Sequence, residues 1–99
     1  MKSALVSIAV GCVSAAVVLA PVAVADEGSF LDELSINGAL LPGKTNVEIV
    51  AAGNQTCSEL RSGTSVLDEM SAVEQRYNFS QGTLFVSAST TNLCPDFAG

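Results

Sequence analysis

The stretch TTNLCPDFAG, residues 90–99, places Cys94 and Pro95 close to the last residue of the sequence. A disulfide from Cys94 would tie the end of the chain back onto another segment. Pro95 would stop a helix there and stiffen the backbone beyond it. The sequence has three cysteines, the other two being Cys12 and Cys57. The partner of Cys94 therefore depends on whether Cys12 remains in the protein.

The beginning of the chain has the layout of a secretory signal peptide. Lys2 precedes an apolar run over residues 4–20, and the small-x-small triplet Ala23-Val24-Ala25 precedes the acidic Asp26. A basic start, an apolar middle and a small-x-small end are typical of such leaders, because the peptidase pocket admits only small side chains. We predict a signal peptide at residues 1–25, cleaved after Ala25.

Two alternatives exist for this segment. A transmembrane anchor needs about 20 apolar residues, whereas this run is shorter, contains Ser and Gly, and has no basic stop-transfer cluster behind it. Lipidation at Cys12 would need cleavage inside the apolar run, which would leave too short an apolar segment before the cut. We therefore expect Cys12 to leave with the signal peptide, and the exported chain to have no stable membrane anchor.

Cleavage leaves residues 26–99, a single small helical domain with two cysteines, Cys57 and Cys94. Thiols pair in the oxidising compartments that exported proteins meet, and two cysteines allow one intramolecular pairing. Closing a loop of about 37 residues is worth roughly 4 kcal/mol in the chain-entropy model. That contribution matters because a core of this size alone supplies about 3–5 kcal/mol. A redox pair would need closer spacing and a tuned thiolate, so we predict a structural disulfide.

The exported domain is strongly acidic. The sequence contains four basic and ten acidic residues. Cleavage removes one basic residue, Lys2, and no acidic residue, which leaves three basic residues and a formal net charge of −7. Nucleic acids and anionic membrane surfaces repel such a chain, and Lys44, Arg61 and Arg76 are scattered rather than clustered. We expect neither class as a partner.

Hydrophobic periodicity predicts four short helices, within residues 26–38, 47–63, 64–78 and 80–94. The fourth segment is rich in β-branched residues and would also suit a strand. A lone strand would have nothing to pair with, so we favour a helix. The predicted fold is all-α: a small bundle of about four short helices closed by one disulfide and preceded by the cleaved signal peptide.

Roles for individual side chains follow from the same spacing. The buried face predicted for the second helix consists of Val47, Val50, Ala51, Asn54, Cys57 and Leu60. The buried face predicted for the third helix consists of Val66, Met70, Val73 and Tyr77. Ser65 and Ser80 are predicted to cap the third and fourth helices. Gly53 is expected to allow the close approach of a neighbouring helix. The acidic pairs Asp32-Glu33 and Asp68-Glu69 are expected on solvated faces.

A spaced pattern of residues also runs along the chain. It consists of Phe30-Leu31, Leu34 and Gly38, then Gly53, Cys57, Leu60 and Gly63, then Phe85-Val86, Ala88 and Cys94-Pro95. With this pattern, residues 30–96 resemble the domain of unknown function 732, a family of small exported proteins found chiefly in mycobacteria and related actinobacteria. The resemblance implies a small helical, disulfide-closed fold and export, and it implies no activity. The chain departs from the family at Leu93, where members often carry Tyr, and at Gly82, where members usually have Ala.

The sequence offers no catalytic constellation. It contains no His, the usual general base and metal ligand, and no calcium-loop spacing occurs. Tyr77 and Met70 are residue types that ligate haem iron, but their helical spacing fits core packing. We therefore expect no enzymatic activity, no metal site and no cofactor.

Two classes of function remain. The first is a non-catalytic binding or interaction module, secreted or held at the cell envelope, with an unknown protein partner there. The second is a carrier of a small apolar ligand such as a lipid or haem. The sequence identifies neither the partner nor the oligomeric state.

Overall fold

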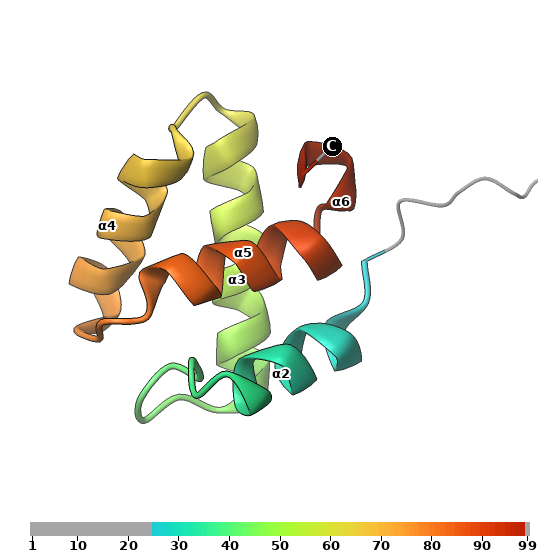
Figure 1. Cartoon of the computed structure of the whole chain (residues 1–99), viewed down its shortest axis with the longest axis vertical. Helices are drawn as coiled ribbons and strands as arrows, with labels where there is room; N and C mark the ends of the chain where they lie inside the picture. Colours follow the sequence, from blue (N-terminus) through green and yellow to red (C-terminus); the bar gives the residue numbers. More distant parts are fainter. Residues whose placement is uncertain (1–24, 99) are drawn as a thin grey trace, which may run out of the picture.

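The structure, a computed structural model, describes residues 25–98, and every regular element in this part of the chain is a helix (Figure 1). The helices are α2 (Glu27–Ile36), α3 (Asn46–Arg61), α4 (Val66–Tyr77), α5 (Gly82–Asn92) and α6 (Pro95–Ala98). The predicted all-α fold is confirmed, and the strand alternative for the fourth segment is wrong. The predicted signal peptide lies outside the described residues except for Ala25, and it stays a prediction.

Local sequence explains where α3 and α4 begin. Thr45 and Glu48 form a reciprocal capping box, in which the Glu48 backbone N–H donates to Thr45 Oγ1 (3.2 Å) and the Thr45 backbone N–H donates to Glu48 Oε1 (2.9 Å). At α4 the predicted Ser65 cap is confirmed, since its hydroxyl oxygen accepts from the Asp68 backbone N–H at 3.1 Å. Each cap satisfies a backbone donor that the first helical turn leaves unpaired.

Helix α5 begins differently. The predicted Ser80 cap is wrong, because Gln81 precedes the helix and makes no side-chain capping bond. Instead, the Gly82 backbone N–H donates to Glu74 Oε2 at 2.9 Å. Glu74 belongs to α4, so the cap of α5 is a tertiary contact that local sequence does not reveal.

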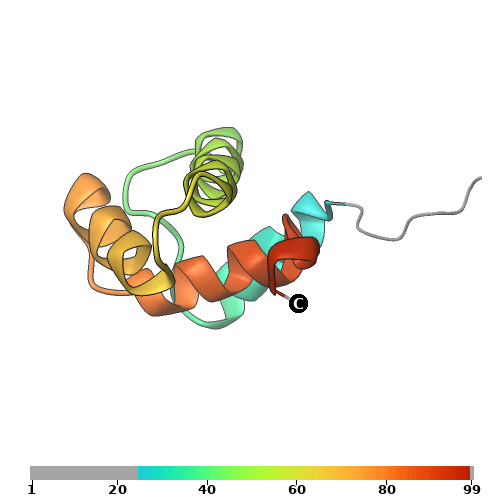
Figure 2. The same ribbon diagram turned by 90° about the horizontal axis from the view of Figure 1, so that it is seen from above.

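Helix α5 lies at the centre of the fold. It contacts α2, α3, α4 and α6, and Figure 2, in which α3 is seen end-on, shows α5 running past α3. The Phe85 ring on α5 packs edge-to-face against Phe30 (centroids 5.6 Å apart) and against Phe79 (6.1 Å). Around these rings lie further buried side chains from every helix from α2 to α5, including Leu34, Ile49, Leu60, Val73 and Val86, together with Leu93, which follows α5.

The buried face of α3 is shifted from the predicted stripe. Val47, at 80% exposure, is in solvent, as are Ala51 and Asn54. The residues that are buried on α3 are Ile49, Ala52, Gly53, Thr56, Cys57 and Leu60. The apolar residues of this helix suit two adjacent faces, and the contacts of the neighbouring helices select the one that contains Gly53.

Gly53 and Gly82 mark the closest approaches between elements. A Cβ atom at Gly53 would lie 2.5 Å from Leu93 Cδ1 and 2.6 Å from Phe30 Cζ, both in the core. A Cβ atom at Gly82 would collide with the Met70 backbone oxygen of α4. The close approach expected at Gly53 is confirmed. Gly82, one of the two departures from the resembling family, stands where α4 and α5 touch.

A disulfide joins Cys57 on α3 to Cys94, which follows α5, with 6.0 Å between their Cα atoms. Both cysteines are buried. Pro95 does more than end α5, because it is the first residue of α6, a position that suits its fixed φ. Asp96 of α6 pairs with Arg61 at the end of α3 (2.8 Å), close in sequence to the disulfide.

Replacing both Cys57 and Cys94 with Ala should lower the free energy of unfolding by roughly 2–5 kcal/mol, because the unfolded chain loses its loop constraint. Thermal melting of the oxidised protein, the reduced protein and the double-Ala variant measures this effect. Equal melting temperatures for all three would show that the cysteines do not support the fold.

Gly53→Ala should lower the stability by about 1–3 kcal/mol, because the new methyl group overpacks the core against Leu93 and Phe30. Gly28→Ala is the matched control. Its Cβ would meet only Asp26 Oδ1 at 3.7 Å, an ordinary contact, so it should raise the stability by up to about 1 kcal/mol through helix propensity. Melting temperatures that move in the same direction for both variants would contradict the close-packing explanation.

Candidate functional site

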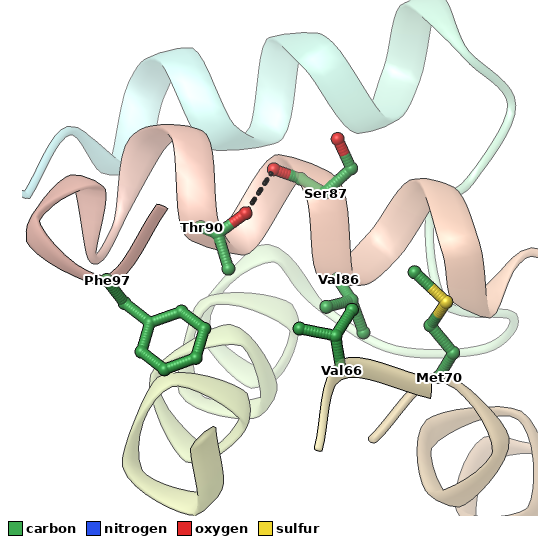
Figure 3. A pocket seen from close by; sticks show the side chains of 6 residues that line it. All are labelled: Val66, Met70, Val86, Ser87, Thr90 and Phe97. Atoms are coloured by element: carbon green, nitrogen blue, oxygen red, sulfur yellow. Dashed lines mark hydrogen bonds between the residues drawn. The ribbon is translucent and has the colours of Figure 1, made fainter. Parts of the chain in front are cut away.

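An apolar groove of about 370 Å³ lies where α4, α5 and α6 meet (Figure 3). Its lining residues are Val66 and Met70 from α4, Val86, Ser87 and Thr90 from α5, and Phe97 from α6. The side chains of Phe97, Val66 and Val86 converge on the same space in Figure 3. None of the lining side chains titrates, so the groove is built for packing and not for proton transfer.

Helical spacing brings the groove residues onto common faces. Val66 is the first residue of α4 and Met70 follows one turn later, while Val86 and Thr90 stand one turn apart on α5. Phe97 reaches the groove because α6 turns back after Cys94, which the disulfide attaches to α3. The disulfide therefore helps to position one wall of the groove as well as the core.

The groove is open to water at two of its edges. Val66 is 40% exposed and Phe97 is 36% exposed, and Leu67, the neighbour of Val66, is 75% exposed. Two threonine hydroxyl groups nearby are engaged, since Thr90 Oγ1 donates to the Ser87 carbonyl oxygen at 3.1 Å and Thr83 Oγ1 contacts Met70 Sδ at 3.6 Å. Clustered apolar side chains that remain in water mark a surface that gains free energy when a partner covers it.

The charged residues elsewhere on the domain give it an excess of negative charge. Arg61 pairs with Asp96 at 2.8 Å, and Arg76 pairs with Glu59 at 3.3 Å. Within residues 25–98 these are the ion pairs present, and Lys44 takes part in neither. Both arginines thus pair with acidic side chains of the same domain, and most of the other acidic side chains are exposed to solvent without a cationic partner.

Glu69 on α4 departs from the prediction for the acidic pairs, because it is fully buried and not on a solvated face. Neither of its carboxyl oxygens has a well-aligned hydrogen bond among the described residues, and the same holds for Thr56 Oγ1 on α3. Burial first, and then the adjacent Glu59 carboxyl, raise the pKa of Glu69 from 4.5 to about 7. The protonated Glu69, together with Gln55 and Arg76, holds the pKa of Glu59 below its usual value.

The two residues considered as haem ligands do not form one site. Met70 and Tyr77 are both half-buried and pack against the core, as their spacing predicts. Met70 also lines the groove, whereas Tyr77 does not, and the Arg76 guanidinium lies 5.9 Å from the centre of the Tyr77 ring. Among residues 25–98 no three His, Cys, Asp or Glu side chains are grouped so as to hold a metal ion.

Sequence reasoning missed Phe97 and the groove itself. Phe97 stands in the short segment after Pro95, which was expected only to stiffen the end of the chain. The sequence does contain a signal for a role of Phe97. Phe97 is a large aromatic residue that follows the last cysteine, and the four predicted helices already supply the core. The prediction that Val66 belongs to the buried face is wrong, because Val66 is 40% exposed at the edge of the groove. Met70 packs against the core as predicted and also lines the groove.

Comparison with known proteins finds a matching family model. Residues 25–96 match the family described as "Protein of unknown function (DUF732)". No curated protein and no solved structure shows a significant match to the chain. None of the helices in residues 25–98 is long and apolar enough to cross a membrane. The matched segment contains α2 to α5 and both cysteines of the disulfide. The chain therefore belongs to the DUF732 family.

Proposed function

We propose that this protein is a non-catalytic binding module that acts at or outside the cell envelope. In this proposal the groove between α4, α5 and α6 takes up an apolar anchor side chain from a basic segment of a partner protein. The observation that carries the proposal is the groove of about 370 Å³, with Val66 and Phe97 partly exposed at its edges.

The geometry of the groove supports an anchoring role. A few apolar anchors that fill pockets supply most of the binding free energy at protein interfaces, while the surrounding contacts exclude water. The groove has room for a side chain of this kind, and Leu67, next to Val66 in the sequence, is a further exposed apolar side chain. The lining carries no general acid, general base or nucleophile activated by one, which supports a non-catalytic role.

The charge of the domain supports a basic partner. Residues 26–99 carry a formal net charge of −7, and the two arginines are paired internally. Opposite charge on a partner raises the rate of encounter and suppresses acidic competitors. Asp68, two residues after the groove residue Val66, adds an exposed negative charge to the first turn of α4.

The start of the helical domain is compatible with cleavage after Ala25. Asp26 is the N-cap of α2, and its carboxylate accepts from the Ser29 backbone N–H at 3.0 Å. The Asp26 backbone nitrogen donates to the Asn92 carbonyl oxygen at 2.8 Å. Removal of the leader at this point keeps both contacts, and the new α-amino group would still donate to Asn92.

A second candidate function is the carriage of a small apolar ligand such as a lipid. Its support is the apolar lining, together with a volume near the lower end of the roughly 300–1,000 Å³ typical of small-molecule sites. Against it stands the exposure of Val66 and Phe97, since carriers bury most of their ligand. A haem ligand is disfavoured because Met70 is the one lining residue of a haem-ligating type.

Val66→Asp should weaken the binding of groove peptides at least about tenfold, because a charged side chain cannot cover an apolar anchor. The peptides come from a random phage-displayed library selected against the oxidised protein. The enriched sequences should carry Lys or Arg around one large apolar residue. Fluorescence anisotropy of labelled peptides then measures the affinities.

Val47→Asp is the matched control for this experiment. Val47 is also exposed, lies in the first turn of α3 and is not among the groove residues. Asp is favourable in a first turn, so both variants should fold. Enrichment of acidic peptides, or equal losses for both variants, would contradict the proposal. Saturable one-to-one binding of a fluorescent fatty acid, without peptide enrichment, would favour the carrier function.

The exported protein should begin at Asp26. Intact-mass measurement of the protein recovered from the culture medium and from the cell envelope checks this expectation. A lipid-modified species that starts at Cys12, or an uncleaved chain in the membrane fraction, would overturn the predicted leader.

A further inference from the structure

We propose that Glu69, Glu59 and Thr56 form a pH-sensitive contact between α3 and α4, which holds α4 firmly while Glu69 is protonated and loosens when Glu69 ionises. This inference rests on the α3–α4 contact and is independent of the proposed function. It concerns a group that the groove does not use.

The first observation is the environment of the Glu69 side chain. It is fully buried, and its two carboxyl oxygens lack well-aligned hydrogen bonds. The polar groups that it meets on α3 are Thr56, whose hydroxyl oxygen is also buried without a partner, and Glu59. A buried carboxyl group in such surroundings is tolerated when neutral, but its ionised form pays a large desolvation cost.

The second observation is the distribution of compensating charge. Arg76 of α4 bonds both oxygens of Glu59, at 3.3 and 3.4 Å, and Gln55 Nε2 donates to Glu59 Oε2 at 3.0 Å. These donors stabilise Glu59 as the carboxylate of the pair. The charged groups that face Glu69 are therefore Glu59 from α3 and Arg76 from its own helix, and Arg76 already serves Glu59.

Helix α5, the other helix in contact with α4, adds no charge. Its sequence GTLFVSASTTN contains no ionisable side chain. Ionisation of Glu69 would place a second negative charge beside Glu59 without a new cation to balance it. The contact can relieve this repulsion only if α4 moves away from α3 or water enters between them.

The direction of the pH dependence follows from the pKa of Glu69, which burial and the Glu59 carboxyl raise from 4.5 to about 7. The folded protein holds this proton more tightly than the unfolded chain does. Its stabilising contribution is fully present below about pH 4.5 and is lost as the pH rises through about 7. Glu59 has the opposite pH dependence. Because its pKa is lowered in the folded protein, its stabilising contribution is lost only when the pH falls below the usual pKa of a glutamate side chain.

Movement of α4 would also reach the groove. Glu69 lies between the groove residues Val66 and Met70 in the sequence of α4. Tyr77, the one tyrosine in a sequence without tryptophan, is the last residue of the same helix. Its fluorescence therefore reports on α4 without any labelling.

The test compares the oxidised protein with Glu69→Gln, which keeps the shape of the side chain and cannot ionise. Between pH 5 and pH 8 the melting temperature of the unchanged protein should fall by roughly 10 °C. At constant temperature its Tyr77 fluorescence should change with a midpoint near pH 7. Both changes should disappear in Glu69→Gln, and at pH 8 this variant should melt at a higher temperature than the unchanged protein.

Asp68→Asn is the matched control, because Asp68 is the adjacent but exposed carboxyl group. It should keep the pH dependence of the unchanged protein. A carboxyl-carbon NMR titration of the unchanged protein provides a readout that needs no variant. A Glu69 midpoint near 4.5, or a Glu69→Gln variant with the same pH dependence as its parent, would overturn the proposal.

Discussion

The disulfide between Cys57 and Cys94 is the constraint on which the other features depend. It attaches the C-terminal half of α3 to the segment between α5 and α6, two parts of the chain separated by 37 residues. The bond keeps α5 across α3, where Phe85 meets Phe30 and where Gly53 allows Leu93 to approach. A domain with so small a core depends on such a covalent link, because the entropy of the unfolded chain otherwise offsets most of the burial.

The same bond has a consequence at the surface. Because Cys94 is held against α3, the turn of helix that begins at Pro95 lies beside the end of α3, where Asp96 meets Arg61. Phe97 then completes an apolar groove whose other walls belong to α4 and α5. The fold therefore places apolar surface and excess negative charge on one small molecule, the combination that suits a basic partner with an apolar anchor.

Helix α4 makes three separate contributions to the structure. It supplies Val66 and Met70 to the groove, it caps α5 through Glu74, and it buries Glu69 against α3. The groove residues and the Glu74 cap connect α4 to α5. Burial of Glu69, in contrast, weakens the packing of α4 on α3 once this carboxyl group ionises. A change of protonation at one residue thus acts on a helix that also shapes the groove.

Much of the architecture was predictable because its causes are local or follow from composition. The helical class, the Ser65 cap, the glycine at the close approach and the pairing of Cys57 with Cys94 all follow from residues read in the sequence. The Thr45 and Glu48 capping box is equally local, since its two residues stand at the required three-residue spacing. Such signals involve neighbours within about one helical turn, where the backbone geometry is known in advance.

Tertiary structure alone decided which faces were buried and what they met. The apolar residues of α3 suited two adjacent faces, and the contacts of Phe30 and Leu93 at Gly53 selected one. Glu69 reads as a solvated residue of a first turn until α3 is seen to cover it, and α5 takes its cap from another helix. The sequence by itself determined the helices, the local caps of α3 and α4, and the covalent link. The packing of the helices determined the groove and the buried carboxyl group, because desolvation depends on neighbours that lie far away along the chain.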